Sequence, residues 1–175
     1  MEEPVVSGVA TDKSQAQITV IGIPDVPGKA AEIFTTVAKA GANIDMIVQN
    51  TPTGSDVTDR VSDISFTLPK ADLQRVAAAL EAAKPSLGYR ELELDDAIGK
   101  LSVVGAGMRT HSGVSATLFG ALAKAGINIE MISTSEIRIS VVTSLAQLDE
   151  AARVVHSAFD LDSDVEAVVY AGTGR

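Results

Sequence analysis

The chain of 175 residues is long enough for one large domain or for two small ones. Its content of 46% hydrophobic and 21% charged residues is typical of a globular protein with a packed core. The net charge of −9 argues against a nucleic-acid partner, which requires clustered cations. The absence of cysteine excludes disulfides and a cysteine nucleophile and is compatible with a reducing compartment, so we expect a cytoplasmic protein.

The N-terminal segment is acidic where a secretory signal would be basic and then apolar. No run of 18 or more apolar residues occurs along the chain. We therefore expect neither export nor insertion into a membrane.

An internal repeat is the strongest pattern in the sequence. Residues 39–47 read KAGANIDMI and residues 124–132 read KAGINIEMI, which are identical at seven of nine positions. Ahead of them, ITVIG at 18–22 corresponds to LSVVG at 101–105. The chain therefore contains two copies of one structural unit.

The first copy predicts a strand, a helix, two strands, a second helix and a final strand. A β-branched run predicts the first strand, and apolar residues at helical spacing, closed by Gly41, predict the helix after it. Alternation of apolar and polar residues predicts two strands that form a hairpin with a long tip at 51–60. The predicted elements are the strand 18–23, the helix 30–38, the strands 44–49 and 64–68, the helix 73–80 and the strand 89–94.

The second copy repeats this βαββαβ order. It predicts the strand 101–104, the helix 114–125, the strands 127–132 and 137–142, the helix 148–159 and the strand 165–170. Each copy fits an α+β, ferredoxin-like unit with two helices on one face of a four-stranded antiparallel sheet. We expect an N-terminal arm at 1–14 and two domains at 15–96 and 97–175; the arm either stands apart or adds a strand to the second domain.

Several motifs of catalytic and metal sites are incomplete in this sequence. Gly105 and Gly107 resemble a dinucleotide loop, but the third glycine is replaced by Thr110. The two histidines have no further ligands at metal-binding spacing, and no serine has the context of a nucleophile. We therefore expect no metal, no cofactor and no active site, and a small ferredoxin-like enzyme remains a minor alternative.

A matched pair of loops precedes the first helix of each copy. A helix N-terminus suits a carboxylate because its N–H groups lack partners. The strand after each helix carries polar residues and an acid that could accept hydrogen bonds from an ammonium group: Asn43, Ile44, Asp45 and Gln49 in the first copy, and Asn128, Ile129, Glu130 and Thr134 in the second. Together they predict a site for a free amino acid; the alternative is that these are ordinary helix starts at a structural interface.

The repeat resembles the ACT domain, and the two-copy chain resembles the regulatory β subunits of actinobacterial-type aspartate kinases. The likeness covers nearly the whole chain. The residues that carry it are Asn43-Ile44-Asp45-Met46 with Gln49-Asn50, the segment 104–108, the segment 128–140 and the ending 168–175.

The resemblance implies a function in amino-acid biosynthesis. In that family the β subunit joins a catalytic α subunit in an α2β2 assembly that threonine and lysine inhibit by feedback, although some members respond to threonine alone. The resemblance also implies a homodimer through the ACT domains, with each effector site between the first ACT domain of one chain and the second of its partner.

The resemblance implies two sets of effector-binding residues and no cofactor beyond the allosteric ligands L-threonine and L-lysine. The threonine set is Asp25, Gly28, Lys29, Ala30, Asn43, Ile44, Asp45, Gln49, Asn128 and Ile129. The lysine set is Met108, Thr110, His111, Gly113, Val114, Glu130, Ser133, Thr134, Ser135 and Glu136.

Two features depart from the family pattern. The hairpin tip at 51–60 is longer than expected and carries Pro52, close to where regulation in the family is sensitive. The amino-acid kinase domain with its Lys-Phe-Gly-Gly-Thr opening is missing, so we expect this chain by itself to be no enzyme. An ACT-domain sensor that controls a different enzyme or regulator is the alternative function.

Overall fold

The computed structural model describes residues 6–106, 111–161 and 168–171, and of 168–171 only the backbone. The chain divides into two compact units. We call Gln15–Asp96 the first unit, and Ala97–Arg175 together with Met1–Ser14 the second unit.

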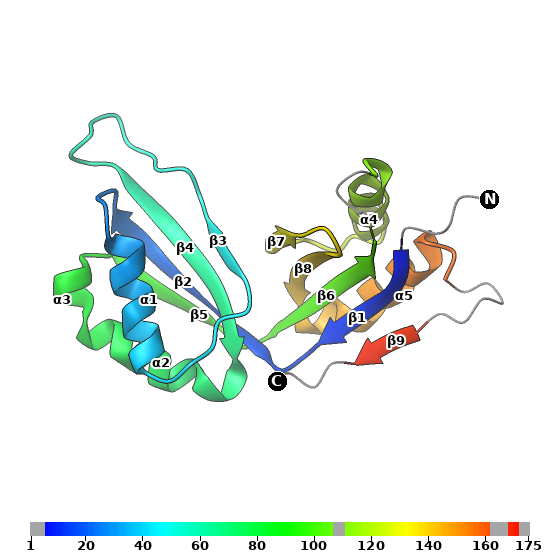
Figure 1. The fold of residues 1–175 in the computed structure, drawn as a ribbon, viewed down its shortest axis with the longest axis horizontal. Coiled ribbons are helices and arrows are strands. Elements are labelled where there is room, and N and C mark those ends of the chain that lie inside the picture. The colour runs from blue at the N-terminus through cyan, green and yellow to red at the C-terminus, as the bar shows by residue number, and fades with distance from the viewer. Residues whose placement is uncertain (1–5, 107–110, 162–167, 172–175) are drawn as a thin grey trace. The chain divides into compact units, whose positions relative to one another are not determined.

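The first unit is a four-stranded antiparallel sheet in the order β3-β4-β2-β5, with α1 and α2 on one face (Figure 1). A 3-10 turn at Lys70–Asp72 leads into α2. The elements are β2 (Gln15–Pro24), α1 (Lys29–Lys39), β3 (Ile47–Gln49), β4 (Val61–Pro69), α2 (Leu73–Ala82), α3 (Lys84–Leu87) and β5 (Glu91–Asp95).

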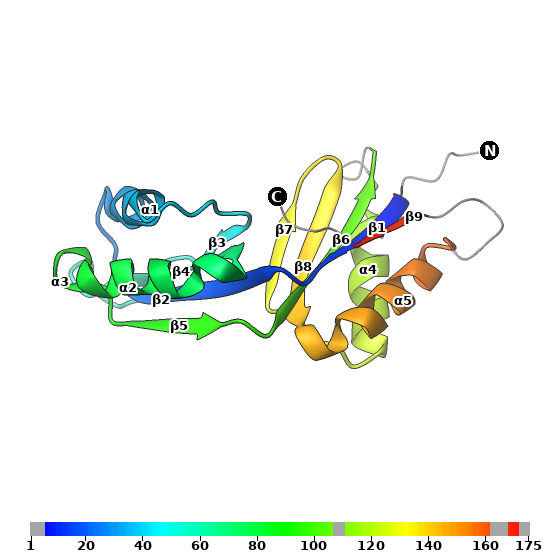
Figure 2. The same ribbon diagram turned by 90° about the horizontal axis from the view of Figure 1, so that it is seen from below.

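The second unit has five strands in the order β7-β8-β6-β1-β9, with α4 and α5 on one face of the sheet (Figure 2). Its elements are β1 (Val6–Asp12), β6 (Ile98–Gly105), α4 (Gly113–Lys124), β7 (Met131–Thr134), β8 (Arg138–Ser144), a 3-10 turn (Leu145–Gln147), α5 (Leu148–Ala158) and β9 (Val168–Ala171). The predicted fold class, two ferredoxin-like α+β units, is confirmed.

Strand β1 lies between β6 and β9, antiparallel to β6 and parallel to β9. It thus occupies the place beside β6 that β5 occupies beside β2 in the first unit. The second sheet is for this reason mixed rather than purely antiparallel, which the sequence pattern did not predict.

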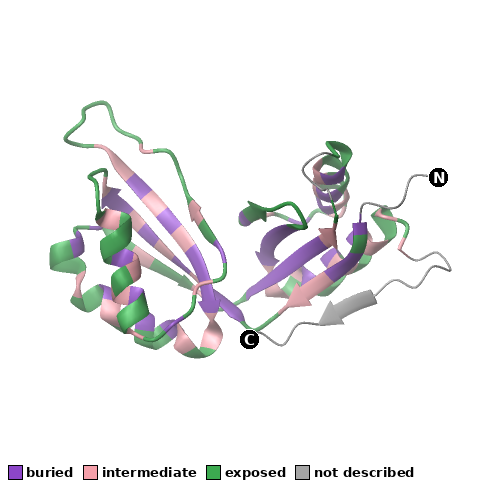
Figure 3. Ribbon diagram, viewed as in Figure 1, coloured by how far each residue is buried: buried purple, intermediate pink, exposed green. Residues whose placement is uncertain are grey.

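Each core lies between the helices and the sheet. Buried residues alternate with more exposed ones along β2 and the first part of β4, whereas β6 and β8 of the second unit are buried over consecutive residues (Figure 3). In the first unit Phe66 is fully buried and Phe34 meets its ring edge-on at a centroid distance of 5.7 Å. On the helix-free faces, matched hydroxyl pairs join neighbouring strands. They are Thr19 with Ser65 at 2.8 Å and Ser102 with Ser140 at 2.7 Å.

The repeated Lys-Ala-Gly sequence ends the first helix of each unit. Gly41 and Gly126 have left-handed φ angles of 79° and 73°, and their N–H groups bond to Ala38 and Ala123. The next residues, Ala42 and Ile127, donate to carbonyls five positions back, which completes a Schellman motif in both copies.

Both strands that follow these helices are shorter than the alternation predicts. The strand predicted at 44–49 begins only at Ile47, because the Met46 N–H donates to the Thr67 hydroxyl at 2.9 Å and interrupts the regular ladder. The strand predicted at 127–132 begins at Met131, because Ile127 completes the helix end. Residues 165–167 of the predicted last strand lie outside the described residues.

Among the described residues, the structure contains no helix that is both long and apolar enough to cross a membrane.

Candidate functional site

The loop before α1 is shaped by its contacts with the hairpin tip. Gly22 donates its N–H to Asp63 Oδ1 at 2.9 Å, and the Asp25 N–H donates to the Arg60 carbonyl at 3.0 Å. Gly28 caps α1 with a φ of 94°, and no side chain caps this helix N-terminus. The N–H groups of the first turn, including that of Ala30, therefore face a position where an anion could accept from them.

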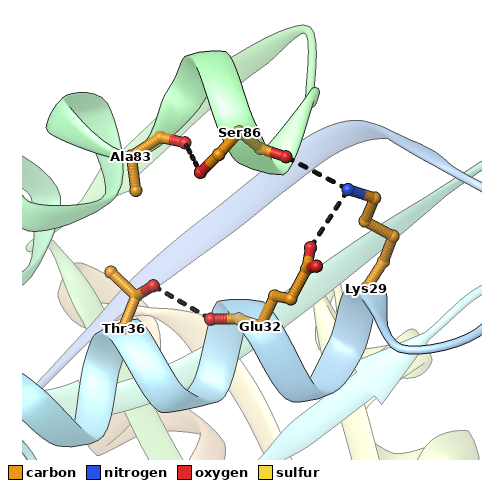
Figure 4. Close-up of polar contacts among 5 residues, drawn as sticks. All are labelled: Lys29, Glu32, Thr36, Ala83 and Ser86. Atoms are coloured by element: carbon orange, nitrogen blue, oxygen red, sulfur yellow. Dashed lines mark hydrogen bonds and ion pairs between the residues drawn. The ribbon is translucent and has the colours of Figure 1, made fainter.

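Lys29 has a structural partner on each side. Its Nζ donates to Glu32 Oε2 at 3.0 Å and to the Ser86 carbonyl at 3.1 Å, so it ties α1 to α3 (Figure 4). Thr36 donates to the Glu32 carbonyl, and the Ser86 hydroxyl donates to Ala83 in the same contact region. The ammonium of this predicted effector residue thus serves helix packing.

Gln49 lies at the same end of the first unit as Asp25. It stands opposite Ile64 in the ladder, on the helix-covered face, and its Nε2 donates to Ser62 Oγ at 3.2 Å. Ser62 in turn pairs with Ile23 of β2, next to the loop. The structure therefore places Asp25, Gly28, Ala30 and Gln49 at the same end of the first unit.

Asn43, Ile44 and Asp45 lie at the opposite end of the first unit. The Asp45 N–H donates to the Thr67 carbonyl, whereas Asp25 is tied to Arg60. A strand rises about 3.3 Å per residue, so the two ends are roughly 20 Å apart. No single amino acid could contact both ends of one unit, contrary to the expectation that these residues lie beside the loop.

The second unit shows the same division. Gly105 donates its N–H to the Ile137 carbonyl at 2.9 Å, so the hairpin that contains Ser133, Thr134, Ser135 and Glu136 lies at the end of β6 where the loop before α4 begins. Glu130, with Asn128 and Ile129, lies at the other end, because its N–H donates to Val142.

The described part of the loop before α4 is His111 onward, since Met108 and Thr110 lie outside the described residues. His111 and Gly113 are exposed, and the Val114 N–H donates to the His111 carbonyl at 3.2 Å. The Val114 side chain is buried in the core and is thus directed away from any ligand.

Hollows on the second unit coincide with the predicted residues only in part. Asn128 and Ile129 line an open hollow of about 470 Å³ together with Phe119 and Ile127. Larger hollows of about 590 Å³ and 510 Å³ lie between α4 and α5 and on the helix-free face. Among the residues that the structure describes, none of the predicted sets lines either of them.

The pKa values of Tyr89 and Glu150 are shifted by contacts outside the predicted effector sets. Burial and the charge of Glu81 raise the pKa of Tyr89, whose hydroxyl donates to the Leu80 carbonyl at 2.8 Å. A hydrogen bond from Arg153 lowers the pKa of Glu150 on the exposed surface of α5. Within the described residues no group of three or more His, Asp or Glu side chains is placed to hold a metal ion.

Two residues of this end were not predicted from the sequence: Arg60, whose guanidinium lies 3.6 Å from Asp25 Oδ2, and Ser62, the partner of Gln49. The unusual length of the hairpin tip was the signal that could have drawn attention to Arg60.

Comparison with known proteins assigns both repeats. The family model of the ACT domain matches residues 18–83 and 101–159. The chain is 52% identical over 175 residues to an aspartokinase of Mycolicibacterium smegmatis, covering 100% of this chain and 41% of that protein. The chain thus spans about two fifths of the length of this relative.

Two solved structures are similar over most of this chain and nearly all of their own. The regulatory subunit of aspartate kinase from Thermus thermophilus, in its ligand-free form, is 42% identical, with a TM-score of 0.82 over 89% of this chain and 99% of that one. A chain from a crystal structure of aspartokinase alpha and beta subunits is 44% identical, with a TM-score of 0.81 over 89% of this chain and 99% of that one. The chain therefore belongs to the ACT domain family, as a tandem pair of the kind found in regulatory subunits of aspartate kinase.

Proposed function

We propose that the chain is the allosteric regulatory part of an aspartate kinase. It binds L-threonine, and also L-lysine, between ACT domains and mediates feedback inhibition of the aspartate-family pathway to lysine, threonine and methionine. The observation that carries this proposal is the match of both repeats to the regulatory subunit of aspartate kinase from Thermus thermophilus over 99% of its length. The kinase catalytic α subunit would be its partner, in an α2β2 assembly.

A homodimer through the ACT domains is supported by the edge strands. Ile47 on β3 and Ile132 on β7 occupy the same place in the repeat and are 51% and 42% exposed. Large apolar side chains on an open sheet edge favour pairing with another strand. We propose that β3 of one chain pairs with β7 of a second copy.

Antiparallel pairing of these edges would build each site from both chains. The end of β3 near Gln49 and Asp25 would then meet the start of β7, next to Asn128 and Ile129. In this arrangement Glu130 would lie beside the residues of the threonine set near Gln49 and Asp25. Asn43 to Asp45 would lie beside the loop of the second unit instead.

The chemistry of the first-unit end suits threonine. The uncapped N–H groups at the start of α1 would donate to the carboxylate, and Asp25 would accept from the ammonium. Gln49 donates its amide N–H to Ser62, which leaves its Oε1 as an acceptor for the threonine hydroxyl. Valine has no hydroxyl and would bind more weakly, because Gln49 Oε1 would then lack the donor that threonine supplies.

Lysine would use the loop before α4, where the hairpin at Ser133 to Glu136 lies at the same end of the unit. Glu136 is exposed there and carries the charge that a lysine side-chain ammonium requires.

The test is inhibition of the complex reconstituted with the kinase catalytic subunit. Asp25→Asn and Gln49→Ala should each weaken inhibition by threonine without lowering the uninhibited rate. Asp96→Asn, an exposed carboxylate at the boundary between the units, is the matched control and should behave as the wild type. Intact inhibition in both site variants would contradict the proposal.

A further inference from the structure

The hairpin tip between β3 and β4 is fixed at its base against the loop before α1. Thr53 and Val61 exchange two backbone hydrogen bonds of 2.9 Å and 3.0 Å, which close the tip. The Arg60 carbonyl accepts from the Asp25 N–H. The backbone therefore holds Arg60 beside Asp25 whatever its side chain does.

The Arg60 side chain places a positive charge next to the carboxylate of Asp25. The Nε to Oδ2 distance is 3.6 Å, which is long for an ion pair, and the two side chains are 40% and 38% exposed. Such a pair is weak because water screens both groups. It can therefore exchange with another cation at modest cost.

Asp25 differs from Asp63 and Glu32, two further carboxylates at this end of the first unit. Asp63 accepts from the Gly22 N–H at 2.9 Å, and Glu32 accepts from Lys29 at 3.0 Å. The contact of Asp25 with Arg60 is longer than either. Of these three carboxylates, Asp25 is thus the one most readily available to an incoming ammonium group.

We infer that Arg60 is a positioning residue that competes with the effector's ammonium for Asp25. The inference rests on the proposed function, because it matters only if Asp25 receives the effector. In the free chain the guanidinium keeps the carboxylate neutralised and oriented, and binding of threonine replaces one cation by another. Arg60 thereby sets the threonine concentration at which the site fills.

The hairpin tip of the second unit is too short to place a residue against the loop before α4 in the same way. Strands β7 and β8 are joined by residues 135–137 only, and the Ser135 N–H bonds to the Arg138 carbonyl across this turn at 2.7 Å. Competition between a residue of the hairpin tip and the effector's ammonium is therefore expected only at the site of the first unit.

The experiment is a calorimetric titration of the purified chain with L-threonine. Arg60→Ala should bind threonine about two- to fivefold more tightly, the range of a weak exposed ion pair. Arg60→Lys should return the affinity to that of the wild type. Arg153→Ala, which removes an exposed, ion-paired arginine of α5, is the control and should leave affinity unchanged.

The outcomes separate the inference from the function on which it rests. Removal of a side chain with a purely structural role would lower the affinity for threonine. A higher affinity in Arg60→Ala, together with wild-type affinity in Arg60→Lys, therefore supports competition. Unchanged or weaker binding in Arg60→Ala overturns the inference while the proposed function stands. If the wild type itself binds no threonine, both are overturned. Thermal unfolding of each variant without ligand reports whether the fold is intact.

Discussion

In the first unit, residues 50–60 join β3 to β4 and contact the loop before α1, whereas residues 135–137 alone join β7 to β8 in the second unit. The opposite ends of the two units are alike, because Gly41 and Gly126 close α1 and α4 with the same hydrogen bonds. The two copies are therefore alike at the end that terminates the helix, where Asn43 to Asp45 and Asn128 to Glu130 lie. They differ at the end where the hairpin tip meets the loop before the first helix. Differences in effector preference would arise at that changed end.

The largest expected difference concerns one strand position in the two sheets. Gly99 of β6 corresponds to Ala16 of β2, and a Cβ added at Gly99 would lie 2.8 Å and 2.9 Å from two carbons of Leu148. We expect Gly99→Ala to lower the free energy of unfolding by about 1 to 3 kcal/mol, because the core is overpacked. Ala16→Gly should cost only about 0.5 to 1 kcal/mol. Denaturant titration measures both, and equal losses would show that the two cores do not differ here.

A hydroxyl pair lies on each helix-free face, but its burial differs between the units. The Ser102–Ser140 pair is buried, whereas the Thr19–Ser65 pair is partly buried. Ser102→Ala should destabilise by about 1 to 2 kcal/mol, because Ser140 then lacks its partner. Thr19→Val should cost less than about 1 kcal/mol. A larger loss in Thr19→Val than in Ser102→Ala would contradict this ranking.

The glycines before the two helices should respond differently to alanine. Gly28 has a left-handed φ of 94°, while Gly113 is the first residue of α4 and has no positive φ. A Cβ would meet no atom within 4 Å at either position, so only backbone strain should distinguish the stability of the two alanine variants. Gly28→Ala should cost about 1 kcal/mol in unfolding free energy and Gly113→Ala should be neutral or stabilising. Similar losses would show that the two helix starts are equivalent.

The smallest effects concern charged side chains on helices. Lys29 is 20% exposed and bridges α1 and α3, so Lys29→Met should destabilise by about 1 kcal/mol. Arg153 pairs with Glu150 on the solvent side of α5, and Arg153→Ala should give no resolvable change in melting temperature. A marked loss in Arg153→Ala would indicate that α5 is covered in solution.

Much of the fold was predictable because its causes are local. The apolar spacing that includes Ile33 and Val37 specified the buried face of α1, and Gly41 marked its end. The start of β3 was not predictable, because the Thr67 hydroxyl that displaces it comes from another strand. The short helix α3 was not predicted, because it contains Pro85 and proline disfavours a helix everywhere except in its first turn, where it lies here.

The spatial arrangement of the predicted site residues could not be read from the sequence. Asn43 and Asp25 fall at opposite ends because α1 spans the length of the sheet between them, about 16 Å at 1.5 Å per residue. Sequence spacing alone does not reveal that separation. Arg60 was not predicted because the tip has no periodicity that would assign its contacts.

The most direct test of the account is thermal unfolding of the purified chain with threonine, lysine, both together, and valine and methionine as controls. Threonine at about 100 times its dissociation constant should add roughly 2.7 kcal/mol, a shift of several degrees, and valine at the same concentration should add much less. A further gain with lysine would indicate a second site. No shift with threonine, or an equal shift with valine, would contradict the claim that these ACT domains bind an amino-acid effector.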